Sequence, residues 1–98
     1  MIIVTGEFEL EPGAIDAVRP AAIEMMRETA KEDGCRYYRF YADVEHPHLV
    51  RVYEEWDSRA ALEAHMQTPH MKVWREALVG KIVSRAVKTI EGGTITPL

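Results

Sequence analysis

The chain has 98 residues, which is the length of one domain, so we treat residues 1–98 as a single unit. Its net charge is −4, with 12 Lys and Arg against 16 Asp and Glu, which argues against a nucleic-acid-binding protein because such proteins present a basic face. No apolar run approaches the roughly 20 residues of a membrane-spanning helix, a secretory signal is not expected at the N-terminus, and the single Cys35 indicates a reducing, cytoplasmic location.

The first third of the chain predicts a strand followed by a long helix. Apolar side chains alternate from Ile2 to Leu10, and Gly6 interrupts them in mid-strand, where it indicates a bulge or room for a bulky neighbour. Apolar residues at three- and four-residue steps then predict a helix over 14–33. Pro20 cannot donate its backbone hydrogen bond, so we expect a kink or a restart there, and Gly34 is placed to cap the helix.

The rest of the chain predicts a hairpin, two short helices and a last strand. The aromatic-rich segment 35–42 and the segment 49–56 read as two antiparallel strands joined by a short polar loop. Asp57-Ser58 signals the start of a short helix, and Thr68-Pro69 starts another helical turn. A final strand is expected over 83–90.

The order strand, helix, strand, strand, helix, strand is that of a ferredoxin-like α+β sandwich, with a four-stranded antiparallel sheet and its helices on one face. The other face would be bare, yet this sheet is apolar and aromatic on more than one side. Tyr37 and Tyr41 alternate with Tyr38 and Phe40, and Leu49 and Tyr53 alternate with Val50 and Val52. A monomer rarely exposes a large apolar patch, so we expect a two-fold homodimer packed sheet on sheet.

His65 and Glu54 are the first candidates for chemistry. His65 lies on the apolar side of its short helix, where burial can bring its titration near neutral pH. Glu54 shares one face of its strand with Trp56 and with apolar residues, so it needs a partner, and His65 is available. A Glu54–His65 pair would orient a general base, and it would equally serve as a buried structural clasp.

The aromatic residues could line a pocket for a flat ligand, although core packing accounts for most of them. His65 and His70 are five apart, and on one continuous helix their rings would point well apart, although Thr68-Pro69 is expected to break the helix between them. With no paired-cysteine or His-x-x-x-His motif we expect no dedicated transition-metal site, and the chain has no glycine-rich phosphate loop or dinucleotide fingerprint. Cys35 reads as a small packed residue rather than a nucleophile.

Several short segments, in order and spacing, resemble the antibiotic biosynthesis monooxygenase domain family over nearly the whole chain. They are Asp33-Gly34-Cys35, Tyr38-Arg39-Phe40-Tyr41, Tyr53-Glu54-Glu55-Trp56, Ala61-Leu62-Glu63-Ala64-His65 and Pro69-His70. The resemblance implies a dimeric α/β barrel with a small cavity between sheet and helices in each subunit. It also implies oxidation of a quinol or phenolic small molecule by O2 with no metal, flavin or other cofactor.

In that family mechanism a base helps to form a phenolate, which gives an electron to oxygen. By resemblance His65 would be the base or proton shuttle and Glu54 would orient it. Trp56 and Tyr38 would shape the pocket floor, and Tyr53 or Trp74 could contribute to substrate binding.

The haem-degrading branch of the family relies on an asparagine of the first strand, and this chain contains no asparagine, so haem degradation is excluded. Two alternatives stay open. One is an isomerase of a phosphorylated signalling sugar, for which Arg36, Arg39 and Arg51 could supply a basic cluster. The other is a non-catalytic ligand-binding or structural dimer in which His65 only holds the helix to the sheet.

Overall fold

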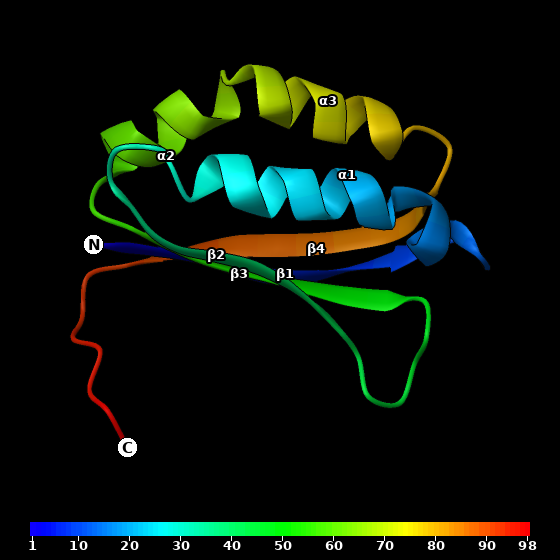
Figure 1. Cartoon of the computed structure of the whole chain (residues 1–98). Coiled ribbons are helices and arrows are strands. Elements are labelled where there is room, and N and C mark those ends of the chain that lie inside the picture. The colour runs from blue at the N-terminus through cyan, green and yellow to red at the C-terminus, as the bar shows by residue number, and fades with distance from the viewer.

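The computed structural model describes all residues from Met1 to Leu98. Four strands and three helices follow one another in the predicted order (Figure 1). The elements are β1 (Ile2–Leu10), α1 (Ala14–Thr29), β2 (Cys35–Ala42), β3 (Leu49–Trp56), α2 (Arg59–Met66), α3 (Pro69–Ala77) and β4 (Ile82–Glu91).

The strands form one antiparallel sheet in the order β2-β3-β1-β4, with β1 in the centre paired to both β3 and β4. All three helices lie on the same face of this sheet (Figure 1). The ferredoxin-like α+β fold predicted from the sequence is therefore confirmed. No helix is both long enough and apolar enough to cross a membrane.

Alternation along the strands divides the sheet into two unlike faces. The helix-facing side carries the core, which includes Phe8, Val52 and Trp56, each at most 5% exposed. The opposite face carries Tyr37 and Tyr41, which are 40% and 46% exposed. The helices cover only the first face (Figure 1).

The helix α1 ends at Thr29, four residues before the predicted Asp33, and it runs through Pro20 without a restart. Residues 30–34 instead form turns, and Gly34 adopts a positive φ of 83° that redirects the chain into β2. A side chain at Gly34 would also meet the Cβ of Ala61 at 2.6 Å. This early end matters for the site, because it places Glu32 in a turn rather than on the helix.

The glycine in mid-β1 marks a close approach of two backbones. The pairing of β1 with β4 continues evenly past Gly6, and its only irregularity falls between Glu9 and Leu10. A Cβ at Gly6 would lie 2.2 Å from the carbonyl oxygen of Ala86 and 2.4 Å from the Cα of Val87. The bulge expected at Gly6 is therefore wrong, and the space beside it is filled by β4 itself.

Candidate functional site

A cavity of about 520 Å³ lies between the helix-facing side of the sheet and the helices α2 and α3. Its wall is mostly apolar, with Tyr38, Phe40 and Trp74 among its aromatic residues. Two ionisable side chains of the buried core also line it, namely Glu54 from β3 and His65 from α2. The volume is within the range of small-molecule sites in proteins.

His65 is held in the wall of this cavity by the short helix α2. That helix begins where Ser58 Oγ accepts a hydrogen bond from the amide of Ala61, as the N-cap signal predicted. The His65 side chain is almost fully buried, and its Nδ1 lies 2.7 Å from Oε2 of Glu32. An ionised carboxylate only accepts hydrogen bonds, so Nδ1 is the protonated nitrogen of a neutral ring and Nε2 keeps a free lone pair. Nε2 has no hydrogen-bond partner in the protein, and it is the nitrogen available to a molecule in the cavity.

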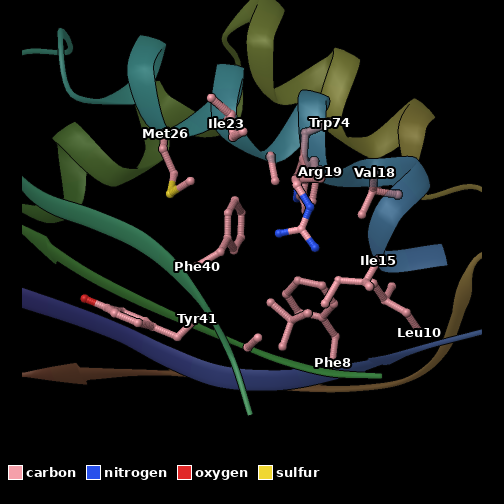
Figure 2. A pocket seen from close by; sticks show the side chains of 13 residues that line it. Phe8, Leu10, Ile15, Val18, Arg19, Ile23, Met26, Phe40, Tyr41 and Trp74 are labelled. Carbon is pink, nitrogen blue, oxygen red and sulfur yellow. The ribbon is translucent and has the colours of Figure 1, made fainter. Parts of the chain in front are cut away.

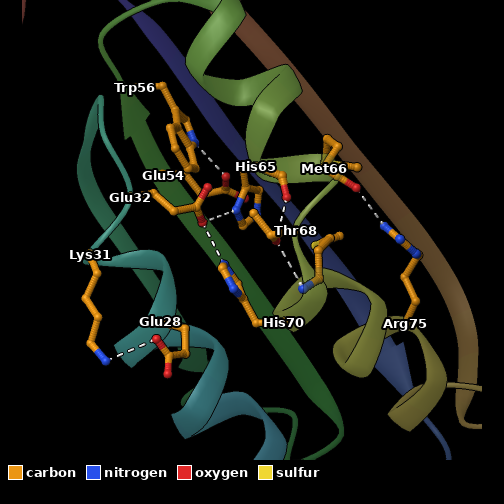
Figure 3. A network of polar contacts seen from close by, with 11 residues as sticks. Glu28, Lys31, Glu32, Glu54, Trp56, His65, Met66, Thr68, His70 and Arg75 are labelled. Atoms are coloured by element: carbon orange, nitrogen blue, oxygen red, sulfur yellow. Dashed lines mark hydrogen bonds and ion pairs between the residues drawn. The ribbon is translucent and has the colours of Figure 1, made fainter.

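Glu32 therefore makes the contact with His65 that was predicted for Glu54. No hydrogen bond joins Glu54 to His65; Oε1 of Glu54 instead accepts the indole N–H of Trp56 at 2.8 Å (Figure 3). The predicted Glu54–His65 pair is wrong at this point, because Glu54 lies on the same strand face as Trp56 and finds its donor there.

Burial shifts the pKa values of His65 and Glu54 in opposite directions. Desolvation lowers the pKa of His65 below its usual 6.5, and the hydrogen bond and charge of Glu32 act against that shift. Desolvation raises the pKa of Glu54 to about 7, and the hydrogen bond from Trp56 opposes the rise. At neutral pH the site thus offers a neutral imidazole and a carboxyl group that is close to its own titration point.

His70 belongs to the same cluster. The chain breaks between α2 and α3, where Thr68 caps the new helix and Pro69 starts it, as predicted. This break brings Nε2 of His70 to 2.7 Å from the same Oε2 of Glu32, with the two imidazole rings 5.9 Å apart between centroids (Figure 3). Divergent rings were expected only for one continuous helix, and the predicted break at Thr68-Pro69 lets the two rings meet at Glu32 instead.

Glu32, His65 and His70 are also the one group of metal-ligating side chains that comes together, with one ligand atom each within 4.8 Å of the others. Glu32 Oε2 lies 2.7 Å from each ring nitrogen, which is a hydrogen-bond length. Two ligands of one tetrahedral Zn²⁺ lie about 3.4 Å apart, given metal–ligand bonds near 2.1 Å. The spacing in this structure is therefore that of a hydrogen-bonded cluster.

Of the four aromatic residues predicted to bind substrate, two line the cavity and two do not. Tyr38 lines the cavity with its ring 5.3 Å from that of His65, and burial raises its pKa. Trp74 also lines the cavity, and with Phe8 and Phe40 it lines a smaller apolar hollow of about 150 Å³ under α1 as well (Figure 2). Trp56 is fully buried, packs on His65 at 4.8 Å and does not line the cavity. Tyr53 lies on the opposite face of the sheet, where its hydroxyl donates to Glu55.

The arginines suggested for a phosphate site do not line the cavity. Arg36 pairs with Asp57 and Arg51 with Glu7, and both arginine side chains are about half exposed. The basic side chains on the cavity wall are Arg59, which pairs with Glu91, and Arg85. Lys88 pairs in register with Thr5, so its side chain alternates to the opposite face of the sheet.

Cys35 lies outside the cavity lining and is half-buried. Burial, with the charge of Glu32, raises the pKa of its thiol to about 11, so it is a protonated and weakly nucleophilic group at neutral pH.

Comparison with known proteins identifies the family of this chain. The antibiotic biosynthesis monooxygenase family matches residues 1–77. The chain belongs to that family. Among curated relatives it is 31% identical to "Probable quinol monooxygenase YgiN" of Escherichia coli over 103 aligned positions, which cover 95% of this chain and 99% of the relative. It is 36% identical to Rv0793 of Mycobacterium tuberculosis over 86 positions, covering 88% of this chain and 83% of that protein.

Solved structures of family members have the same fold. The structure of Rv0793 matches with a TM-score of 0.87 at 27% identity and covers 98% of each chain. An antibiotic biosynthesis monooxygenase homologue from Deinococcus radiodurans matches with a TM-score of 0.89 at 22% identity, covering 100% of this chain and 98% of the other.

The sequence identified His65 but missed its two partners. Glu32 is one of 16 acidic residues and was assigned to the end of a helix, so nothing in the pattern distinguished it. For His70 the signal is the predicted Thr68-Pro69 break, since a new helix start between two histidines changes the direction of the second one.

Proposed function

We propose that this protein is a monooxygenase that oxidises a quinol or phenolic small molecule with O2 and needs no metal or flavin. The family membership and the quinol monooxygenase name of a relative support the reaction class. The observation that carries the proposal is His65, a buried imidazole whose Nδ1 is fixed by Glu32 and whose Nε2 is free in a wall of the cavity.

In this proposal Nε2 of His65 accepts the proton of a substrate hydroxyl. The resulting phenolate is a much better electron donor to O2 than the neutral phenol. One oxygen atom enters the product and the other leaves as water, which carries two hydrogens of the substrate. Glu32 keeps the ring oriented and stabilises the imidazolium, and Glu54, which is protonated below pH about 7, can return a proton to the reduced oxygen.

The cavity wall supports a flat aromatic substrate. Tyr38 and Trp74 supply aromatic surface beside His65, whereas Trp56 acts from behind as the donor that holds Glu54. An apolar wall also keeps water from the phenolate, which strengthens its interaction with the imidazolium. Tyr53 lies outside this arrangement and is assigned no role in binding.

The functional unit in this proposal is a homodimer in the cytoplasm. Tyr37, Tyr41 and Ile90 lie on the sheet face that no helix covers, and each is at least 40% exposed. A second copy placed sheet on sheet would bury these side chains. The cytoplasmic location rests on the lone Cys35.

An isomerase of a phosphorylated sugar is the second candidate. It is favoured by the two basic side chains Arg59 and Arg85 on the cavity wall, since phosphate recognition commonly uses such groups. Oxygen uptake distinguishes the two candidate functions, because a monooxygenase consumes O2 and an isomerase does not.

The test is oxygen consumption by the purified protein with hydroquinones, naphthoquinols and anthrones, in buffer containing EDTA. We expect turnover with at least one of these, and a loss of roughly 100-fold or more in the His65→Ala variant. His46→Ala is the matched control, because this imidazole is 67% exposed on the loop between β2 and β3. No uptake by the wild type with any compound, or an equal rate in His65→Ala, contradicts the proposal.

A further inference from the structure

The cluster of Glu32, His65 and His70 has one end in the cavity and the other at the protein surface. His65 lines the cavity and His70 does not. His70 instead lines a hollow of about 360 Å³ on the other side, between α1 and the start of α3. One oxygen atom, Oε2 of Glu32, accepts a hydrogen bond from each ring, so a continuous chain of two hydrogen bonds links the cavity to the surface (Figure 3).

The charges around the cluster differ at its two ends. Around His65 lie the aromatic rings of Tyr38 and Trp56. Glu54 lines the same cavity wall, and the charge of Arg75 on α3 disfavours a second positive charge there. His70 shares its hollow with Glu24 and Glu28 of α1, of which Glu28 is paired with Lys31 at 3.1 Å. A positive charge is therefore better placed on His70, next to acidic side chains and solvent, than on His65.

Glu32 carries one negative charge and touches both rings, so it compensates one imidazolium at a time. Two imidazolium rings 5.9 Å apart would repel each other in a partly buried site. A proton added to one ring thus favours loss of a proton from the other.

We propose that Glu32 and His70 couple proton uptake by His65 in the cavity to proton release from His70 at the surface. In the coupled cycle His65 starts neutral with the extra proton of the cluster on His70, and both rings donate to Glu32. When Nε2 of His65 takes a proton from the substrate hydroxyl, Nδ1 of His70 releases one to solvent. Nδ1–H of His65 and Nε2–H of His70 keep their hydrogen bonds to Glu32 throughout, and the charge of the cluster stays constant.

This coupling rests on the proposed function, and it adds Glu32 and His70 to the residues that take part in proton transfer. Deprotonation of the substrate converts a neutral imidazole and a neutral hydroxyl into an imidazolium–phenolate pair, so it adds no net charge to the cavity. What the coupling relieves is the repulsion between the imidazolium of His65 and a second imidazolium that shares Glu32. With the coupling, His65 acquires its charge as His70 loses one, and the exchange reverses when His65 gives its proton to the reduced oxygen. Glu32 and His70 are positioning and proton-transfer residues, since neither lines the cavity.

The kinetic test uses His70→Gln, because glutamine can still donate to Glu32 and cannot carry a proton. We expect kcat to fall roughly tenfold or more, KM to stay within about twofold, and added imidazole to restore kcat in a saturable way. His46→Gln, on the exposed loop, should match the wild type with and without imidazole. A His70→Gln variant that turns over at the wild-type rate, or a loss that imidazole does not restore, overturns the coupling.

A second test needs no substrate, so it stands even if no quinol is oxidised. The titration of His65 is followed by NMR of protein labelled with ¹⁵N-histidine. In His70→Gln, His65 should take up its proton at a higher pH than in the wild type, because the charge of Glu32 is no longer shared. His46→Gln should leave that pH unchanged. An identical His65 titration in the wild type and in His70→Gln overturns the coupling, whereas a silent oxygen assay with a shifted titration refutes only the proposed reaction.

Discussion

His65 and Glu32, 33 positions apart in the sequence, are joined by a hydrogen bond of 2.7 Å between Nδ1 and Oε2. The bond exists because α1 ends at Thr29 and leaves Glu32 in a turn beside α2. It fixes which nitrogen of His65 carries the proton and leaves the other one for the cavity. The candidate base is thus assembled from two segments that no local pattern connects.

Replacing Glu32 with glutamine should change both the rate and the pH dependence of turnover. Burial lowers the pKa of His65 below 6.5, so kcat/KM should rise with pH through a limb below that value, as the base loses its proton. The charge and hydrogen bond of Glu32 raise this pKa, so Glu32→Gln should move the limb to lower pH and reduce the plateau roughly tenfold or more.

The measurement is a pH–rate profile of the wild type and two variants. Glu45→Gln is the control, because that carboxylate is 86% exposed and touches only His46. A limb that moves to higher pH in Glu32→Gln would contradict the assigned orientation of His65.

Glu54 makes the stability of the fold depend on pH. Its pKa is 4.5 when exposed in the unfolded chain and about 7 in the folded protein. Between these values the folded state holds more protons, so the free energy of unfolding should fall as pH rises, by at most roughly 3 kcal/mol. Glu54→Gln cannot ionise, so it should lack this loss and exceed the stability of the wild type above pH 7. The lowered pKa of His65 adds a rise of stability with pH that both proteins share.

Urea denaturation at pH 5 and pH 8 checks this, with Glu9→Gln, an exposed carboxylate on β1, as the control. The prediction fails if the wild type and Glu54→Gln lose the same stability between the two pH values.

The elements of this fold were predictable because their signals are local. Alternation in β1, the Ser58 cap and the Thr68-Pro69 start all act within a few residues, and the structure confirms these three predictions. The end of α1 was misplaced because helical periodicity continues in residues 30–33, while the turn depends on the positive φ of Gly34 and its packing against Ala61.

The site was predictable only in part for a related reason. Helix and strand periodicity placed His65 and Glu54 on buried faces, and both line the cavity. The carboxylate that bonds to His65 is set by the packing of the turn after α1 against α2. That packing is a tertiary contact, which local sequence patterns do not encode. The pairing with Glu54 was inferred from face sharing alone, and Trp56 satisfied that carboxylate instead.

Gly6→Ala should destabilise the sheet at its centre. The added Cβ would lie 2.2 Å from the backbone carbonyl of Ala86, so β1 and β4 would have to separate locally. We expect a loss of about 3 kcal/mol, the upper end of the cost of overpacking. Urea denaturation measures it, with Thr5→Ala on the same strand as control, and a loss below about 0.5 kcal/mol would show that β4 can move away freely.

A homodimer through the uncovered sheet face should be broken by charge on that face. Tyr41 is 46% exposed on β2, and its hydroxyl meets that of Tyr37, so a carboxylate there would be buried without a partner in a sheet-on-sheet dimer. In analytical ultracentrifugation the wild type should have twice the chain mass of 11.2 kDa. The mass of Tyr41→Glu should shift toward that of one chain at micromolar concentration.

The control for this experiment is Val73→Glu, a 55% exposed position on α3 at the helical face, which should stay dimeric. If Val73→Glu dissociates and Tyr41→Glu does not, the subunits associate through the helices instead. Because the cavity lies on the helix side of the sheet, a dissociated Tyr41→Glu protein should keep the hydrogen bonds of His65, and its ¹⁵N-histidine spectrum should report an unchanged Nδ1–H.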